Sequence, residues 1–243
     1  NTWDKDSRDW NVNYVNGRVF GNNNATTGII TGVDFSTGAL NMGTNSSGQL
    51  MYEPGFFTKD TKPGKQVLSG YKLSLSRSGD TYKLTDVKKD NESVLRGYTT
   101  EGANFYPLDS IRNDNPDSAN DNDHNDYFGM RYDIEFKIGD YLGDLNYTFK
   151  GDDDLWAVLD AKENGGNVVI DLGGIHSALD KSVDLWKTIL RNDNYEPEDR
   201  KNLSEDERNK THTLTILYME RGAYASNCQM EFTLPNSKVI NSE

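Results

Sequence analysis

Three consecutive carboxylates, Asp152, Asp153 and Asp154, are the residues of this chain whose type and spacing most clearly suggest chemistry. Adjacent carboxylates repel one another, and solvent, a proton or a bound cation relieves that repulsion. Hard oxygen ligands held at a fixed turn suit calcium. The triplet therefore has two interpretations: half of a calcium site, or a solvated acidic turn that accepts hydrogen bonds from nearby backbone amides.

The segments on both sides of the triplet have the patterns of β-strands. An alternating apolar and polar run covers residues 145–149, and an apolar run covers residues 155–159. These patterns place the triplet at a turn between two strands. The second strand is expected to pair with residues 168–172, because the Asn-Gly-Gly sequence at 164–166 is typical of a hairpin loop.

The whole chain predicts an all-β fold, an antiparallel β-sandwich or barrel with long loops and one or two short helices. A helix is predicted over residues 177–191, and Ser204 is expected to cap a second short helix within the charged, exposed segment 192–210. Further short strands are predicted at residues 28–33, 70–75, 81–87, 127–138, 213–219 and 229–234.

The charge of the chain limits its partners. The net charge is −13 and the isoelectric point about 4.7, which argues against nucleic acid or an anionic membrane surface as partner. No apolar run approaches the length of a membrane span, so membrane insertion is not expected. An acidic surface suits an extracellular protein that meets sugars, cations or both.

Cys228 is the one cysteine, so an intrachain disulfide and a cysteine-based zinc cluster are both excluded. Surface proteins of Gram-positive bacteria often lack disulfides, whereas animal extracellular proteins of this size usually have them. We expect Cys228 to be a buried strand thiol rather than part of a thioester.

Catalysis is not expected from these residues. A glycosidase needs two carboxylates on opposite sides of a cleft, and neighbouring aspartates at one turn cannot flank a glycosidic bond in that way. No Ser/His/Asp arrangement is evident, since the chain has only His124, His176 and His212. We therefore predict a protein that is not an enzyme.

Three segments resemble, in this order, the motifs of the fibro-slime family: residues 151–156 (Gly-Asp-Asp-Asp-Leu-Trp), residues 169–176 (Val-Ile-Asp-Leu-Gly-Gly-Ile-His), and residues 218–227 with Glu220-Arg221 and Ser226-Asn227. That family is a bacterial branch of the PA-14 superfamily of lectin-like β-sandwich domains. The resemblance covers roughly residues 100–235. It implies one PA-14-like ectodomain fragment over residues 1–243, with early strands in 1–100, the core in 100–235 and an exit linker in 236–243.

The resemblance also implies a calcium site. In sugar-binding PA-14 domains, two successive aspartates joined by a cis peptide bond bind one calcium ion, and a second loop adds an asparagine and backbone carbonyls. Hydroxyl groups of a sugar complete the coordination. Matched onto this chain, the metal ligands are Asp152, Asp153 and Asn227, with the carbonyls of Ala223 and Ala225.

Three further residues are candidates for contact with a sugar. Trp156 and Tyr224 could stack on a sugar ring, although side chains on alternating strands fit the core equally well. Asp154 either contacts the ligand or points into the structure and holds a backbone turn.

Four residues are expected to support the site from beneath. Asp171 and His176 frame Gly173 and Gly174. We expect the two polar side chains to fix this glycine-bearing loop rather than to bind metal directly. The Glu220-Arg221 pair is interpreted as structural.

The predicted function is a calcium-dependent, carbohydrate-binding adhesin module on a bacterial cell-surface protein, anchored to the cell wall through regions outside this fragment. Its expected partner is a glycan on another surface. Two alternatives stay open: a stalk or pilus-tip module in which calcium only stiffens the fold, and a carbohydrate-binding appendage of a polysaccharide-degrading enzyme.

Overall fold

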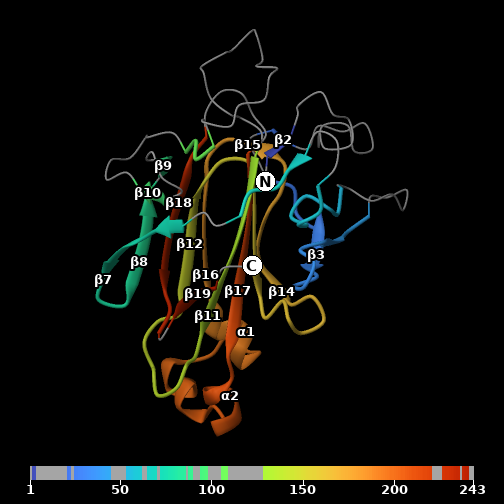
Figure 1. Cartoon of the computed structure of the whole chain (residues 1–243). Coiled ribbons are helices and arrows are strands. Elements are labelled where there is room, and N and C mark those ends of the chain that lie inside the picture. The colour runs from blue at the N-terminus through green and yellow to red at the C-terminus, as the bar shows by residue number, and fades with distance from the viewer. Residues whose placement is uncertain are drawn as a thin grey trace.

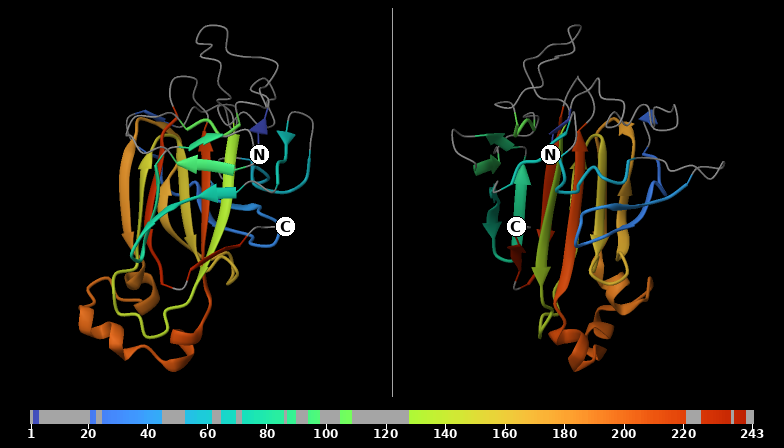
Figure 2. Two further views of the ribbon diagram at one scale, coloured as in Figure 1. Left: turned by 60° about the vertical axis from the view of Figure 1, so that its left-hand side comes forward. Right: turned by 45° about the vertical axis from the view of Figure 1, so that its right-hand side comes forward.

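The computed structural model describes residues 2–3, 21–22, 25–44, 53–61, 65–69, 72–85, 87–89, 94–97, 105–108, 128–220, 226–235 and 237–240. Within these residues the protein is all-β, with two main sheets packed face to face (Figures 1 and 2). The predicted all-β sandwich is therefore confirmed.

The first sheet has the order β14-β13-β17-β11-β1-β5, with β19 also paired to β11. Its strands are β14 (Asn167–Leu172), β13 (Asp154–Leu159), β17 (His212–Glu220), β11 (Phe128–Phe136), β1 (Thr2–Trp3), β5 (Lys65–Gln66) and β19 (Lys238–Ile240). The second sheet has the order β16-β12-β18-β8-β7. Its strands are β16 (Leu179–Asp184), β12 (Asn146–Gly151), β18 (Cys228–Thr233), β8 (Thr81–Thr85) and β7 (Ser76–Ser78).

Smaller elements complete the described structure. The additional strands are β3 (Ile30–Val33) with β4 (Leu40–Met42), β6 (Lys72–Ser74) with β10 (Val94–Gly97) and β9 (Val87–Lys89), and β15 (Ile175–His176) with β2 (Gly21–Asn22). The helices are α1 (Leu185–Leu190), the 3₁₀ helix η2 (Pro197–Asn202) and α2 (Glu205–Asn209). Figure 1 places α1 and α2 together at one end of the sandwich and β15 at the other.

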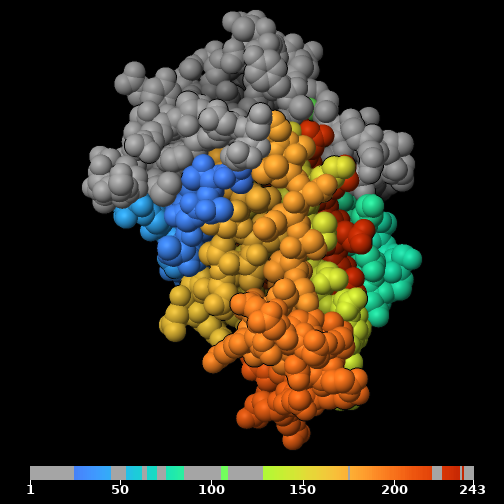
Figure 3. Space-filling model, turned by 180° about the vertical axis from the view of Figure 1, so that it is seen from behind, coloured from blue at the N-terminus to red at the C-terminus, as the bar shows by residue number. Residues whose placement is uncertain are grey.

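Strands β13 and β17 are buried on both faces because the first sheet is covered on both sides. Alternate side chains such as Leu155 and Ile216 enter the core between the two sheets. The opposite side chains, including Trp156 and Leu217, enter a second core beneath the β3–β4 hairpin. Figure 3 shows residues 25–44, in blue, lying against the strands drawn in gold.

Each predicted strand overlaps an observed one, and β13 pairs with β14 as expected. The hairpin between them has positive φ at Asn164, Gly165 and Gly166, which is the chemistry that the sequence indicated. Ser204 caps α2 as predicted, since its hydroxyl accepts a hydrogen bond from the backbone N–H of Glu207 at 3.2 Å.

The prediction of one helix over residues 177–191 is wrong in its first half. Residues Leu179–Asp184 form β16, which pairs antiparallel with β12 along six residue pairs. The apolar residues Leu179 and Val183 fit a period of two as well as a helical period, so the available strand edge decided the conformation. The helix begins only where the Asp184 side chain accepts a hydrogen bond from Trp186 N.

The expected exit linker over residues 236–243 also differs from the structure. Residues Lys238–Ile240 form β19, which pairs antiparallel with β11 from Asp133 to Glu135. This part of the segment therefore belongs to the first sheet.

Candidate functional site

Two neighbouring crossovers between the sheets create the candidate site. Residues 152–153 lead from β12 in the second sheet to β13 in the first, and the chain returns from β17 to β18 through residues 221–227. β12 pairs with β18 and β13 pairs with β17, so both crossovers lie at the same end of the sandwich. The acidic triplet is therefore a connection between sheets and not a hairpin turn.

Asp152 and Asn227 join the two crossovers through a pair of short hydrogen bonds. Asn227 N donates to Asp152 Oδ1 and Asn227 Nδ2 donates to Asp152 Oδ2, each at 2.7 Å. Asp152 N donates back to Asn227 O at 3.3 Å. The two residues that the resemblance matched to one calcium site are thus in direct contact, while their binding of calcium stays a prediction. The contact leaves Asn227 Oδ1 as an oxygen that does not face the carboxylate.

Gly151 allows this close approach. A Cβ atom at this position would lie 2.2 Å from the backbone carbonyl oxygen of Asn227, a distance that real Cβ atoms essentially never show. The glycine therefore permits the Asn227 backbone to lie beside the end of β12.

The Asp152 carboxylate is only 9% exposed. Burial raises its pKa above the ordinary value, while the two hydrogen bonds from Asn227 and the nearby His176 act in the opposite direction. Among the described residues, Asp152 has no ion pair with lysine or arginine. A buried carboxylate of this kind would gain from a bound cation.

Asp153 follows in a left-handed conformation, with φ of 53°, and is 3% exposed. None of the described peptide bonds is cis, so the Asp152–Asp153 bond is trans. The cis bond that the resemblance implied is therefore absent here.

Asp154 is completely buried and accepts a hydrogen bond from Gly174 N at 2.6 Å. This agrees with the interpretation in which Asp154 holds a backbone turn. Gly174 itself has φ of 97°, a conformation that suits glycine. Asp154 therefore fixes the loop after β14 to the start of β13.

Asp171 supports the same region from the next strand. Its Oδ1 accepts from Trp156 Nε1 at 2.9 Å and its Oδ2 from Gly28 N at 2.6 Å. Gly173 exchanges two backbone hydrogen bonds with Thr26. Asp171 thus fixes the indole and the segment before β3, whereas Asp154 fixes the glycine-bearing loop.

Trp156 cannot stack on a sugar ring in this structure. Its side chain is fully buried in the core beneath the β3–β4 hairpin. The prediction that Trp156 contacts ligand is wrong, because the strand on which it lies is covered on both faces.

His176 is 5% exposed, and its Nδ1 lies 2.9 Å from the Ser177 carbonyl oxygen. Its Nε2 is buried without a hydrogen-bond partner in the described structure. The imidazole therefore brings an unsatisfied polar atom into the same acidic region as Asp152.

Glu220 is a buried member of this region that the sequence interpretation treated only as structural. It is completely buried at the end of β17 and accepts a hydrogen bond from the Tyr218 hydroxyl at 3.0 Å. That hydroxyl also lies 3.2 Å from Ser226 Oγ. Burial first, and then the charge of Glu220, raise the pKa of Tyr218 well above its usual value. The apolar run of residues 216–219, directly before Glu220, was the signal that this end of β17 would be buried.

The predicted metal ligands Ala223 and Ala225 and the predicted sugar contact Tyr224 lie outside the described residues. In the described part of the chain, no group of three or more histidine, cysteine, aspartate or glutamate side chains converges into a complete metal site. Asp152, Asp153 and Asn227 Oδ1 nevertheless supply the hard oxygen donors that calcium prefers. Their chemistry fits calcium, with other ligands needed to complete its coordination.

Comparisons with known proteins give relatives but no family. No protein-family model matches the chain, and no solved structure matches it. Protein psiC of Dictyostelium discoideum is 34% identical over 108 residues, which cover 43% of this chain and 19% of that protein. Protein psiD of the same organism is 31% identical over 127 residues (51% and 21%), and protein psiK is 28% identical over 170 residues (65% and 20%). The chain thus spans about a fifth of the length of these relatives.

No helix among the described residues is long and apolar enough to cross a membrane.

Proposed function

We propose that this chain is a calcium-dependent carbohydrate-binding module of an adhesin on a cell surface. The observation that carries the proposal is the contact between Asp152 and Asn227, which holds a buried carboxylate where the two crossovers meet. The resemblance to fibro-slime domains supports the same residues. The bacterial source expected from that resemblance stays a prediction, since the relatives reported above come from Dictyostelium discoideum.

In the proposed site, Asp152 and Asp153 hold the cation, and the Asn227 amide turns over so that Oδ1 replaces Nδ2 on the side of Asp152 and approaches the cation from the second crossover. Calcium, when bound, supplies coordination positions that two neighbouring sugar hydroxyls can occupy. The residues of the chain keep these ligands in place: Gly151 admits the Asn227 backbone, and Asp154 fixes the loop behind the site.

Calorimetric titration of calcium into chelator-treated protein tests the metal. We expect binding at or below the millimolar range, and loss of that binding in Asp153→Ala. Asp193→Asn provides the control, because Asp193 is an exposed carboxylate outside the site. Absence of binding, or equal binding in Asp153→Ala and the wild type, would refute the calcium site.

A stalk module in which calcium only stiffens the fold is the second candidate. It is favoured by the same Asp152–Asn227 contact, because a cation there would tie the two crossovers together without meeting a ligand. A glycan array with and without chelator separates the two functions. Hits that disappear with chelator support the lectin, whereas a blank array with intact calcium binding supports the stalk.

A further inference from the structure

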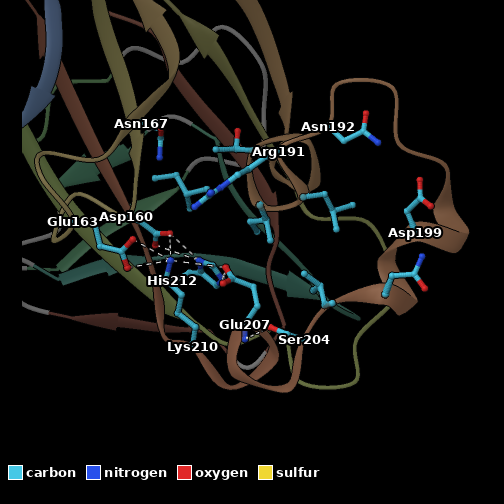
Figure 4. Close-up of a pocket in the computed structure, with 16 residues that line it drawn as sticks. Asp160, Glu163, Asn167, Arg191, Asn192, Asp199, Ser204, Glu207, Lys210 and His212 are labelled. Carbon is cyan, nitrogen blue, oxygen red and sulfur yellow. Dashed lines mark hydrogen bonds and ion pairs between the residues drawn. The ribbon is translucent and has the colours of Figure 1, made fainter.

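A polar cavity lies at the opposite end of β13 from the acidic triplet. Its volume is 450 Å³, and it lies between the hairpin after β13, the end of α1, and the segment that carries η2 and α2. Figure 4 shows the side chains around it, with His212, Asp160, Lys210 and Glu207 gathered on one side. Since β13 runs from Asp154 to Leu159, this cavity is separated from the proposed calcium site by the length of the strand.

Asp160 and His212 form a fixed pair at the base of the cavity. Asp160 has φ of 56°, and its carboxylate accepts hydrogen bonds from Thr213 N at 3.1 Å and Lys210 Nζ at 3.0 Å. His212 Nδ1 lies 3.0 Å from the same carboxylate. Burial acts to raise the pKa of Asp160, but the hydrogen bonds from His212, Lys210 and Thr213 N, with the charge of His212 when the imidazole is protonated, outweigh it and lower the pKa.

An ionised carboxylate can only accept hydrogen bonds, so His212 Nδ1 must be the donor in this pair. In the neutral imidazole, Nε2 is then a hydrogen-bond acceptor. The His212 side chain is 1% exposed, and Nε2 has no hydrogen-bond partner in the described structure. The site thus contains a buried acceptor whose position is fixed and whose bonding is unsatisfied.

Glu207 presents a second acceptor next to the first. Its Oε1 lies 3.5 Å from His212 Nε2, and its side chain is 32% exposed. Two acceptors that face each other across this distance cannot bond to each other while the imidazole is neutral. They call for a molecule that brings hydrogen-bond donors, and the exposed Glu207 side chain can rotate to admit it.

The charges around the cavity oppose an anionic ligand. The lining carries four carboxylates (Asp160, Glu163, Asp199 and Glu207) against two cationic side chains, Arg191 and Lys210. Lys210 Nζ lies 3.0 Å from both Asp160 and Glu163 and 3.8 Å from Glu207, so three of the carboxylates share one ammonium group. The lining also includes the apolar side chains of Leu190 and Leu203 and the amide of Asn192.

We propose that this cavity binds a small neutral polyhydroxyl ligand, such as a simple sugar, whose adjacent hydroxyls donate to His212 Nε2 and Glu207 Oε1. Hydroxyl groups both donate and accept, which matches a lining that mixes carboxylates with amides and cations. The carbon skeleton of the ligand contacts the apolar side chains. This binding needs no calcium, and it is independent of the site at the other end of the sandwich.

Nuclear magnetic resonance of the whole ¹⁵N-labelled chain in chelator tests the proposal. Glucose, galactose, mannose and N-acetylglucosamine are titrated separately while the backbone amides and the His212 side-chain nitrogens are followed. We expect at least one sugar to give saturable shifts of Asn192, Lys210 and His212 Nε2. Because the chelator removes calcium, failure or success here does not depend on the proposed calcium site.

Glu207→Gln is the decisive variant. The glutamine amide can donate to His212 Nε2 and satisfy it from within the protein, so sugar affinity should fall about tenfold, the effect of one lost hydrogen bond. Glu205→Gln is the matched control, because Glu205 is exposed on the same helix and does not line the cavity. It should bind as the wild type does.

Three outcomes would overturn the proposal. The first is the absence of saturable shifts with every sugar in a folded protein. The second is unchanged sugar affinity in Glu207→Gln. The third is saturation of the same amides by methylammonium chloride and not by sugars, which would make this a cation site.

Discussion

Replacing Gly151 with alanine is the sharpest test of the arrangement at the two crossovers. The new Cβ would lie 2.2 Å from the Asn227 carbonyl oxygen, so that oxygen must retreat by about 0.8 Å to reach the shortest contact that real Cβ atoms make. This first conflict is with backbone, and the new Cβ would also lie 2.5 Å from Cζ of the fully buried Phe149 ring. An equal displacement of Asn227 would lengthen its 2.7 Å bonds to Asp152 to about 3.5 Å, at the outer limit of a hydrogen bond.

The expected cost combines two effects. Overpacking a well-packed site costs about 1–3 kcal/mol. Weakening hydrogen bonds to a charged group adds about 1.5–3 kcal/mol for each one that is lost. We therefore expect the free energy of unfolding to fall by about 3 kcal/mol, which for a domain of this size lowers the melting temperature by about 6–12 °C.

Thermal and urea unfolding of Gly151→Ala and Gly143→Ala provide the measurement. At Gly143 the new Cβ would also meet an atom at short range, 2.4 Å away, but that atom is the hydroxyl of Tyr141 and can move. The control should lose much less stability than Gly151→Ala. Equal losses would mean that the Asn227 backbone does not press against Gly151, and the description of the crossover contact would then be refuted.

Three other predictions concern separate parts of the fold. Arg200→Lys should lower the free energy of unfolding by about 2 kcal/mol in urea, because a lysine cannot bond simultaneously to the Leu142 carbonyl, the Tyr195 hydroxyl and Asp144; an unchanged midpoint would contradict this. The lowered pKa of Asp160 means that its stabilising contribution is present above its unfolded pKa of 3.8 and is lost as the pH falls through the lower folded value. Urea unfolding between about pH 6 and pH 2 should therefore show a weaker acid dependence in Asp160→Asn than in the wild type. Trp156→Phe should cost about 1–3 kcal/mol, through the lost bond from Trp156 Nε1, yet leave calcium and glycan binding unchanged; a selective loss of glycan binding would contradict its burial.

The strands of this protein could be predicted because their signals are local. Residues 145–149 alternate cleanly, and β12 has alternate residues buried as that pattern requires. The prediction of a helix over residues 179–184 was wrong because the local pattern does not decide the conformation. The apolar side chains of this segment fit a strand period of two as well as a helical period. Only the free edge of β12, which the sequence does not display, selects the strand.

The Asp152–Asn227 pair could be predicted only from the resemblance, since 75 residues separate its members. Asp152 and Asn227 meet because the chain crosses between the sheets twice at the same end of the sandwich. To predict that contact, one would need to know that β12 pairs with β18 and β13 with β17. Chain patterns indicate which residues form strands, but they leave open which strands are neighbours. The predicted contact of Trp156 with ligand failed for the same reason, because nothing local showed that both faces of β13 are covered.

The contact between Asp160 and His212 could not be predicted, because it follows from the pairing of β13 with β17. In the sequence, His212 is only one of three histidines, and no local pattern assigns a role to Asp160. In the structure, Leu159 is opposite Leu214 in the antiparallel β13–β17 pairing, so the residue after β13 must lie beside the first residues of β17. This register brings Asp160 to His212 and Thr213. Lys210, two residues before His212, also reaches the Asp160 carboxylate. Once two strands are known to be antiparallel neighbours, a polar residue just beyond the end of one and a histidine at the start of the other form a candidate site by geometry alone.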